Sequence, residues 1–102
     1  MYKVKFIKNV WDGKSQNSSS KFSIFKKELE LNFVPVPGMK FNFGRRSSES
    51  PIDISWISEE QEFHCNMPDE FEHWKFDSHM NYKYNCQSLV DEGWEFVGDM
   101  DA

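Results

Sequence analysis

The sequence lacks any hydrophobic run near the ~20 residues that a membrane-spanning helix needs. Its first segment, MYKVKFIKNV, alternates lysine with apolar residues, so we expect neither a signal peptide nor a membrane contact. Cysteine is scarce as well, because Cys65 and Cys86 are too few for a disulfide framework. These absences predict a small soluble cytoplasmic protein whose thiols are free and buried.

Basic residues are nearly absent from the second half of the chain. Residues 1–50 hold ten Lys/Arg and four Asp/Glu, a charge of +6, whereas residues 51–102 hold two and thirteen, a charge of −11. The whole chain therefore carries −5. The asymmetry fits an acidic interaction surface, but it also fits basic and acidic strands that neutralise each other across one sheet.

Aromatic side chains are plentiful, with ten Phe and four Trp among 102 residues. Each large ring buries on the order of 150–250 Å², which makes one core feasible at this length. We predict a single domain over residues 1–102. Flexible polar loops are expected near 12–21 and 44–50, the second containing Arg45 and Arg46, and a frayed acidic tail at 98–102.

The clearest structural pattern lies in Pro51–Met67, around which the rest of the chain is organised. Two arms alternate apolar and polar residues with a period of two, and the polar segment Ser58–Gln61 lies between them. This pattern is typical of an antiparallel hairpin with one buried and one solvated face. The residues predicted on the buried face are Ile52, Ile54, Trp56, Phe63, Cys65 and Met67.

Three segments of the first half alternate in the same way. Tyr2–Trp11 predicts a first strand, and Phe22–Val34 predicts a second strand whose change of phase indicates a β-bulge near Phe25–Lys26. Pro37-Gly38 suits the two central positions of a type II turn. We therefore expect Met39–Phe43 to return beside the second strand as a hairpin.

The last third predicts a short strand at Phe71–Phe76, one helix at Tyr82–Glu92 and a final strand after it. Gly93 suits the left-handed C-cap of that helix, and Asn85 suits its N-cap if the helix starts late. The segment LVDEGWEFV, residues 89–97, resembles a motif that recurs in small bacterial domains of unknown function. The resemblance implies a helix-to-strand corner and a bacterial or phage origin.

These elements together predict an α+β domain that is mostly β. We expect a strongly bent antiparallel sheet, or a small partly open barrel, of five to seven strands with one short C-terminal helix. Tyr2–Trp11 is expected at an edge of this sheet, where it would also allow a homodimer by strand pairing.

Motifs for catalysis and metal binding are missing. The chain has no G-x-S-x-G elbow and no phosphate-binding loop, and its many carboxylates lie in solvated polar runs. His73 and His79 have the only zinc-like spacing, while the neighbours His64 and Cys65 point to opposite faces of a strand. We therefore expect no enzyme, no cofactor and no metal, and the sequence pI of about 5.1 argues against nucleic acid.

Protein binding through the acidic half is the function that remains. Acidic side chains steer a basic partner toward them, and tryptophan is enriched among binding hot spots. An inhibitor, an immunity protein or a phage-encoded antagonist would act in this way. The alternative is a small-ligand-binding or catalytic domain with its site at the mouth of the bent sheet. The residues predicted for the binding surface are Glu59, Glu60, Glu62, Asp69, Glu70, Glu72, His73 and Trp74.

Overall fold

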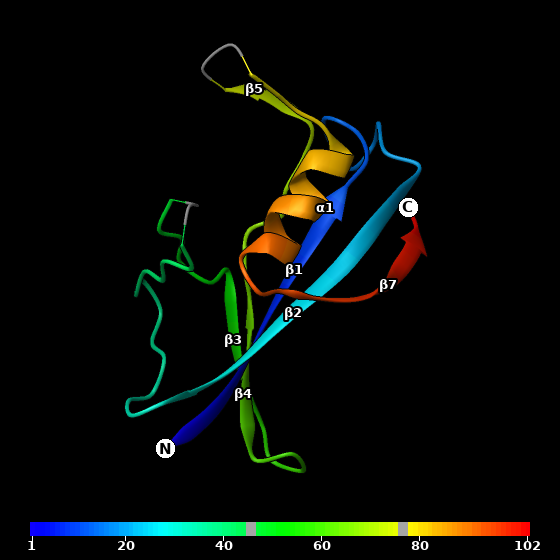
Figure 1. Cartoon of the computed structure of the whole chain (residues 1–102). Helices are drawn as coiled ribbons and strands as arrows, with labels where there is room; N and C mark the ends of the chain where they lie inside the picture. Colours follow the sequence, from blue (N-terminus) through cyan, green and yellow to red (C-terminus); the bar gives the residue numbers. More distant parts are fainter. Residues whose placement is uncertain (45–46, 76–77) are drawn as a thin grey trace.

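The computed structural model describes residues 1–44, 47–75 and 78–102. The predicted α+β class, mostly strand with one short helix near the C-terminus, is confirmed (Figure 1). In the described part of the chain, no helix is long and apolar enough to cross a membrane. The elements in chain order are β1 (Tyr2–Trp11), β2 (Lys21–Leu31), β3 (Asp53–Ile57), β4 (Glu62–Asn66), β5 (His73–Lys75), β6 (Ser78–Met80), α1 (Tyr82–Asp91) and β7 (Glu95–Asp101).

Five strands form one open sheet in the order β3-β4-β1-β2-β7, and β5 and β6 form a separate two-stranded sheet. The large sheet is mixed and not purely antiparallel, because β1 and β4 run parallel. The sheet does not close into a barrel. The prediction that Tyr2–Trp11 forms an edge is wrong, because β1 pairs with β2 on one side and β4 on the other. The edges are β3 and β7.

The strands β4 and β7 pair with opposite halves of the long β1–β2 hairpin. β4 pairs with the first half of β1, at Lys3–Ile7, and β3 continues that end. β7 pairs with the first half of β2, at Lys21–Lys26, which lies beside the second half of β1. As a result, the β3–β4 turn and the β5–β6 hairpin lie at opposite ends of the molecule (Figure 1).

The core lies on one face of the sheet, under α1 and residues 39–43. The buried apolar residues of this face are Val4, Phe6, Val10, Phe25, Cys65, Met67, Leu89 and Trp94. The predicted turn at Pro37-Gly38 is confirmed, since Gly38 has φ +86° and Met39 N–H donates to Val36 O at 3.2 Å.

The predicted hairpin between Met39–Phe43 and the second strand is wrong. The sheet order places only β1 and β7 beside β2, and this segment crosses the core face instead. Phe41 and Phe43 each pack edge-on against Phe6, with ring centroids 4.9 Å apart. The backbone of Phe41 pairs with Glu49.

The predicted hairpin around Ser58–Gln61 is confirmed as β3–β4, with Ile54 opposite Cys65. Its buried face is smaller than predicted, because only Cys65 and Met67 are fully buried there. Ile52 is 70% exposed and Trp56 is 52% exposed. β3 is an edge strand, so Trp56 remains largely in contact with water, whereas Ile54 is partly buried against the core.

The predicted bulge near Phe25–Lys26 does not lie in β2. Ser23 and Phe25 are buried, Leu29 is half-buried on the same face, and the β1–β2 register runs without interruption. The irregularity is in the β2–β7 ladder, where Ile24 faces Gly98 and Phe25 faces Phe96. The extra residue is thus Val97 in β7.

Both ends of α1 use local capping. Asn81 is the N-cap and its side chain accepts a hydrogen bond from Tyr84 N–H, so the predicted cap at Asn85 is wrong. Gly93 has φ +90° and closes the helix with bonds from Gly93 N–H to Val90 O and from Trp94 N–H to Leu89 O. The chain then enters β7, so residues 98–101 belong to a paired strand instead of a frayed tail.

The first predicted loop connects β1 to β2. Asp12 organises the first loop by accepting hydrogen bonds from Ser20 N–H, Lys21 N–H and the Ser20 hydroxyl, and the hydroxyl bond lowers the pKa of the Asp12 carboxyl. In the second loop, Arg45 and Arg46 lie outside the described residues. Phe76 of the predicted strand Phe71–Phe76 also lies outside them.

Ion pairs on the outer face of the sheet join the basic and the acidic half of the chain at Lys5–Glu62 and Lys26–Glu95. Lys3 faces Glu30 across β1–β2, and Lys5 Nζ lies 3.4 Å from Glu62 Oε1 on β4. Lys26 forms ion pairs with Glu28 and Glu95 at 3.2 and 3.4 Å. Basic strands of the first half therefore lie beside acidic strands of the second half.

Candidate functional site

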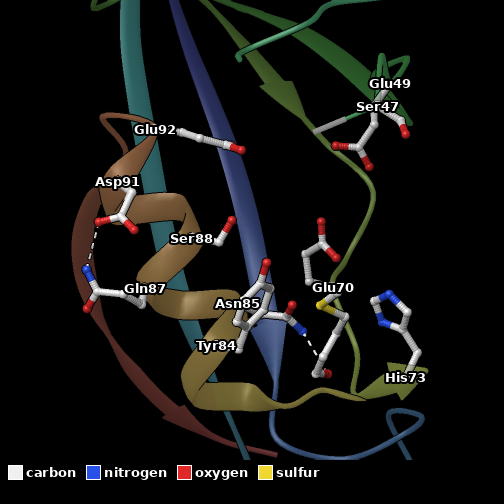
Figure 2. A pocket seen from close by; sticks show the side chains of 11 residues that line it. Ser47, Glu49, Glu70, His73, Tyr84, Asn85, Gln87, Ser88, Asp91 and Glu92 are labelled. Atoms are coloured by element: carbon white, nitrogen blue, oxygen red, sulfur yellow. Dashed lines mark hydrogen bonds between the residues drawn. The ribbon is translucent and has the colours of Figure 1, made fainter. Parts of the chain in front are cut away.

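A cavity of about 390 Å³ lies beside α1, and we call it the α1 cavity. Side chains of α1 line one wall, and residues 47–49, Glu70 and the β5–β6 hairpin line the other, facing them in Figure 2. Four carboxylates and one imidazole contribute to its surface. The described residues that line it are Ser47, Glu49, Glu70, His73, Met80, Tyr84, Asn85, Gln87, Ser88, Asp91 and Glu92.

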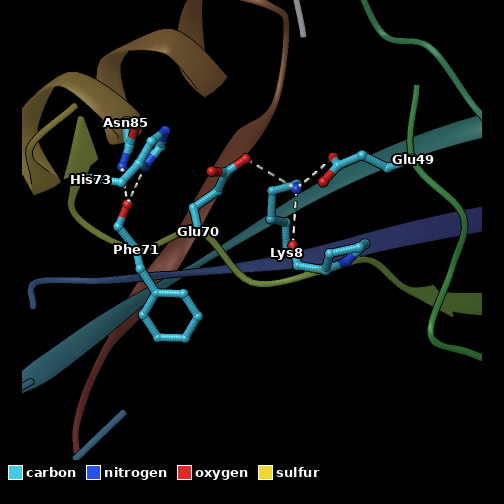
Figure 3. Close-up of polar contacts among 7 residues, drawn as sticks. Lys8, Glu49, Glu70, Phe71, His73 and Asn85 are labelled. Carbon is cyan, nitrogen blue, oxygen red and sulfur yellow. Dashed lines mark hydrogen bonds and ion pairs between the residues drawn. The ribbon is translucent and has the colours of Figure 1, made fainter. Parts of the chain in front are cut away.

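Lys8 connects the walls of this cavity to the sheet. It follows Val4 and Phe6 on the core face of β1, and its side chain is 1% exposed. Its Nζ donates to Glu49 Oε1 at 2.7 Å, Pro68 O at 2.9 Å and Glu70 Oε1 at 3.3 Å (Figure 3). A buried ammonium requires such partners. Lys8 therefore joins β1 to the segment at Glu49 and to the segment Pro68–Glu70.

Asn85 attaches the helix to the chain that leads into the β5–β6 hairpin. The residue is buried, and its Nδ2 donates to Phe71 O at 3.1 Å and to Met80 O at 3.5 Å. His73 Nδ1 also contacts Phe71 O, at 2.8 Å (Figure 3). These side-chain bonds fix the base of the hairpin together with backbone bonds to the end of β1, from Trp11 N–H to Glu70 O and from Glu72 N–H to Gly13 O.

The β5–β6 hairpin presents two different faces. His73 pairs with Met80, and both line the α1 cavity. Trp74 pairs with His79 on the opposite face, where the rings stack at 4.7 Å with an interplanar angle of 20°. Trp74 is 67% exposed, and His79 Nε2 lies 2.7 Å from Glu72 Oε1. The exposed indole is therefore held in place by a neighbour that stacks on it and is itself hydrogen-bonded to Glu72.

The predicted binding residues separate into two groups. Glu59, Glu60 and Glu62 lie at the β3–β4 turn, at the far end of the sheet from β5 (Figure 1). The remaining five lie in one segment that runs beside the second half of β1 and continues into β5. They are Asp69, Glu70, Glu72, His73 and Trp74.

Several of these acids have partners within the chain. Trp11 Nε1 donates to Asp69 Oδ2 at 3.1 Å, Glu70 binds Lys8, and Glu72 binds His79. Their charge contributes to the structure as well as to the surface. The sequence reveals the presence of these acids but not their pairing, which depends on long-range contacts.

Among the described residues, one cluster has donor atoms close enough together to hold a metal ion: Glu62 and His64 on the outer face of β4, and Glu60 in the turn before it. His64 Nε2 lies 2.8 Å from Glu62 Oε1 and 3.3 Å from Glu60 Oε2. The hydrogen bond from His64 lowers the pKa of Glu62 to about 2, with further contributions from Glu60 and Lys5. His73 and His79, the zinc-like pair of the sequence, lie on opposite faces of their hairpin.

A second hollow of about 480 Å³ lies between α1 and the β2–β7 ladder. Phe25, Val90 and Phe96 form apolar walls, and the Ser23 hydroxyl bonds to the Tyr82 hydroxyl and the Asp99 carboxylate. Tyr82 and Cys86 also line this hollow, and burial raises both of their pKa values.

The cysteines are not suited to nucleophilic attack. Both are free, as predicted, with Cys65 buried and Cys86 half-buried. Burial raises the pKa of Cys65 to about 11, with a contribution from Asp53, and raises that of Cys86. A reactive cysteine needs a lowered pKa, because the thiolate is the nucleophile.

Sequence reasoning missed Lys8 and the helix residues of the α1 cavity. Lys8 interrupts an otherwise apolar face of β1, and this is the signal that identifies it as a buried charge. Asn85 precedes the buried Leu89 by four positions, which places both on the same side of the helix. Neither signal reveals which distant segment provides the partner.

Comparison with protein-family models, with curated proteins and with solved structures finds no match to this chain.

Proposed function

We propose that the protein is a non-enzymatic protein-binding module whose partner presents a basic surface to the β5–β6 hairpin and the adjoining α1 cavity. An inhibitor, an immunity protein or a phage-encoded antagonist would work in this way. The exposed and stacked Trp74 carries the proposal. Of the residues predicted from the sequence, the proposal keeps those from Asp69 to Trp74 and leaves out those at the β3–β4 turn.

Trp74 has the properties of a binding anchor. Its ring is largely in water, although burying an aromatic side chain of this size is favourable. The stack on His79 restricts its rotamers before any partner arrives, which reduces the entropy lost on binding. Tryptophan is also among the residue types most enriched at binding hot spots.

Carboxylates near the hairpin supply electrostatic attraction. Asp91 is exposed at the rim of the α1 cavity, and Glu72 stands directly before β5. Acidic groups around an aromatic anchor speed the encounter with a basic protein and do so most at low salt. The partner that fits best carries Lys or Arg around an apolar pocket that accepts an indole.

The test uses affinity capture from cells of the source organism, with the wild-type chain and two tryptophan variants as baits. Trp74→Ala is expected to lose the partner, whereas Trp56→Ala is expected to retain it. Trp56 is a matched control because it is also exposed but lies on the far hairpin. Equal capture by both variants, or capture of an acidic partner alone, would contradict the proposal.

Charge reversal then tests the steering. With the purified partner, Asp91→Lys should lower the association rate at low salt, and the effect should shrink as salt is added. Glu59→Lys makes the same change at the opposite end of the sheet and should leave the rate nearly unchanged. The opposite ranking would place the contact at the β3–β4 turn.

The α1 cavity itself favours a second candidate, a small-ligand site. A volume of about 390 Å³ with several convergent polar groups lies in the range of ligand pockets. A fragment library screened by NMR tests it: ligands that shift resonances of Tyr84 and Ser88 without moving those of Trp74 would support this candidate over the protein-binding one.

A further inference from the structure

Two carboxylates and one imidazole gather on the outer face of the sheet, at the end remote from the α1 cavity. Glu62 and His64 alternate along β4, and Glu60 precedes them in the turn, within the sequence EQEFH. One donor atom from each of the three residues lies within 4.8 Å of the other two. The three side chains therefore converge already, although they come from an extended segment.

We infer that Glu60, Glu62 and His64 bind one first-row divalent metal ion, for which Zn²⁺ is the natural probe. Zn²⁺ accepts imidazole nitrogen and carboxylate oxygen at about 2.0–2.2 Å, and a water molecule completes the tetrahedral set in open sites. The imidazole distinguishes this cluster from the acidic turns elsewhere in the chain. Ca²⁺ and Mg²⁺ prefer oxygen donors alone, so they fit less well.

The setting of the ligands supports the inference. β4 is paired with β3 on one side and β1 on the other, so two of the ligands stand on a strand held from both edges. The side chains of Glu62 and His64 are only 16% and 22% exposed. Ligands on a rigid, partly desolvated strand lose little freedom when they coordinate an ion.

Lys5 is the competing group. It lies opposite His64 on β1, and its Nζ is 3.4 Å from Glu62 Oε1, so the ammonium and a metal ion share one carboxylate. Removing the ammonium should tighten metal binding, because a positive charge is repelled by the ion at this distance. This expectation separates a metal site from a simple hydrogen-bonded cluster, which Lys5 would only stabilise.

The experiment is isothermal titration of the chelator-treated full chain with ZnCl₂. The wild-type chain should bind one ion. His64→Gln should weaken binding by more than about tenfold, since even the loss of outer-sphere partners costs about 10–100-fold. Lys5→Gln should strengthen binding several-fold, up to about tenfold, with the gain falling as salt rises. Zn²⁺ should raise the thermal midpoint of the wild-type chain and not that of His64→Gln.

Two matched controls guard against adventitious binding. Glu59→Gln removes a carboxylate from the same turn, and His73→Gln removes an exposed imidazole elsewhere, so both should bind as the wild type does. Far-UV circular dichroism confirms that each variant is folded. The inference is overturned if the wild-type chain shows no one-to-one binding, if His64→Gln binds equally well, or if Lys5→Gln binds no tighter.

Discussion

The β3–β4 and β5–β6 hairpins come from similar alternating sequence but are held in different ways. β3 and β4 share five residue pairs, and β4 shares five more with β1. β5 and β6 share three pairs, and no further strand lies beside them in the part of the chain that the structure describes. The first hairpin belongs to the sheet, whereas the second is held at its base, by the side chain of Asn85 and by the backbone bonds of Glu70 and Glu72 to residues 9–13.

This difference indicates where a partner can bind with least disruption. Local stability follows the number of buried apolar contacts and protected backbone bonds, and the β5–β6 hairpin has few of either. A partner that bound at Trp74 would therefore disturb few contacts of the five-stranded sheet. Four substitutions, in decreasing order of their expected effect on stability, test how differently the two hairpins are held.

Lys8→Met should destabilise the protein the most, by about 3 kcal/mol, because it leaves Glu49 and Glu70 without their shared buried cation. The segment between the two hairpins should loosen with it. Urea denaturation measures the loss. Lys26→Met is the control, since its ion pairs on the outer face are more exposed and should contribute far less to stability. Similar losses in the two variants would contradict the structural role assigned to Lys8.

Asn85→Ala should cost about 1–2 kcal/mol, because the carbonyl groups of Phe71 and Met80 lose a buried donor. Hydrogen exchange should accelerate in β5 and β6 and remain slow in β3 and β4. Gln87→Ala on the exposed side of the same helix should change neither quantity. Uniformly faster exchange in both hairpins would show that Asn85 supports the whole fold and not the hairpin base.

Glu62→Gln should cost about 1 kcal/mol at pH 7 and should alter the acid limb of the stability curve. The pKa of Glu62 is lowered from 4.5 to about 2, so its stabilisation is fully present above pH 4.5 and is lost as the pH falls toward 2. Urea denaturation at several pH values, in a chelating buffer, should show a steeper acid decline for the wild type than for the variant. Parallel curves would mean that Glu62 has the same pKa folded and unfolded.

Trp74→Ser should have the smallest effect on stability, within about 0.5 kcal/mol, because the side chain is mostly in water. Trp56→Ser should cost more, about 1 kcal/mol, since that indole packs against Phe63 at 4.9 Å. Thermal denaturation compares the two. A larger loss for Trp74→Ser would show that the indole supports the fold and would weaken its assignment as a binding anchor.

Short-range features could be predicted from the sequence. The pairing of Ile54 with Cys65 follows from two alternating arms around one turn. Gly38 and Gly93 were recognisable because a turn and a helix end each require positive φ. The paired strands of opposite charge were one of two interpretations of the charge asymmetry, and the Lys5–Glu62 pair supports it.

Features that depend on distant neighbours could not be predicted in this way. Met39–Phe43 alternates like a strand, but Phe41 and Phe43 pack on Phe6 in the core and the segment does not pair with β2. The acidic run at Asp69–Glu72 resembles an open surface, yet three of its carboxylates have partners at Trp11, Lys8 and His79. The candidate site was therefore found only in part, through Glu70, His73 and Trp74.

By itself, the sequence determined the α+β class, the β3–β4 hairpin, the turn at Pro37-Gly38, the end of the helix and the separation of charge. These follow from periodicity and backbone preference, which act over a few residues. The tertiary structure alone decided that β1 is central, that Lys8 is buried, and that the acidic residues divide between two ends of the sheet. The reason is physical: burial and ion pairing depend on which distant segments share a face, and only the folded chain brings those segments together.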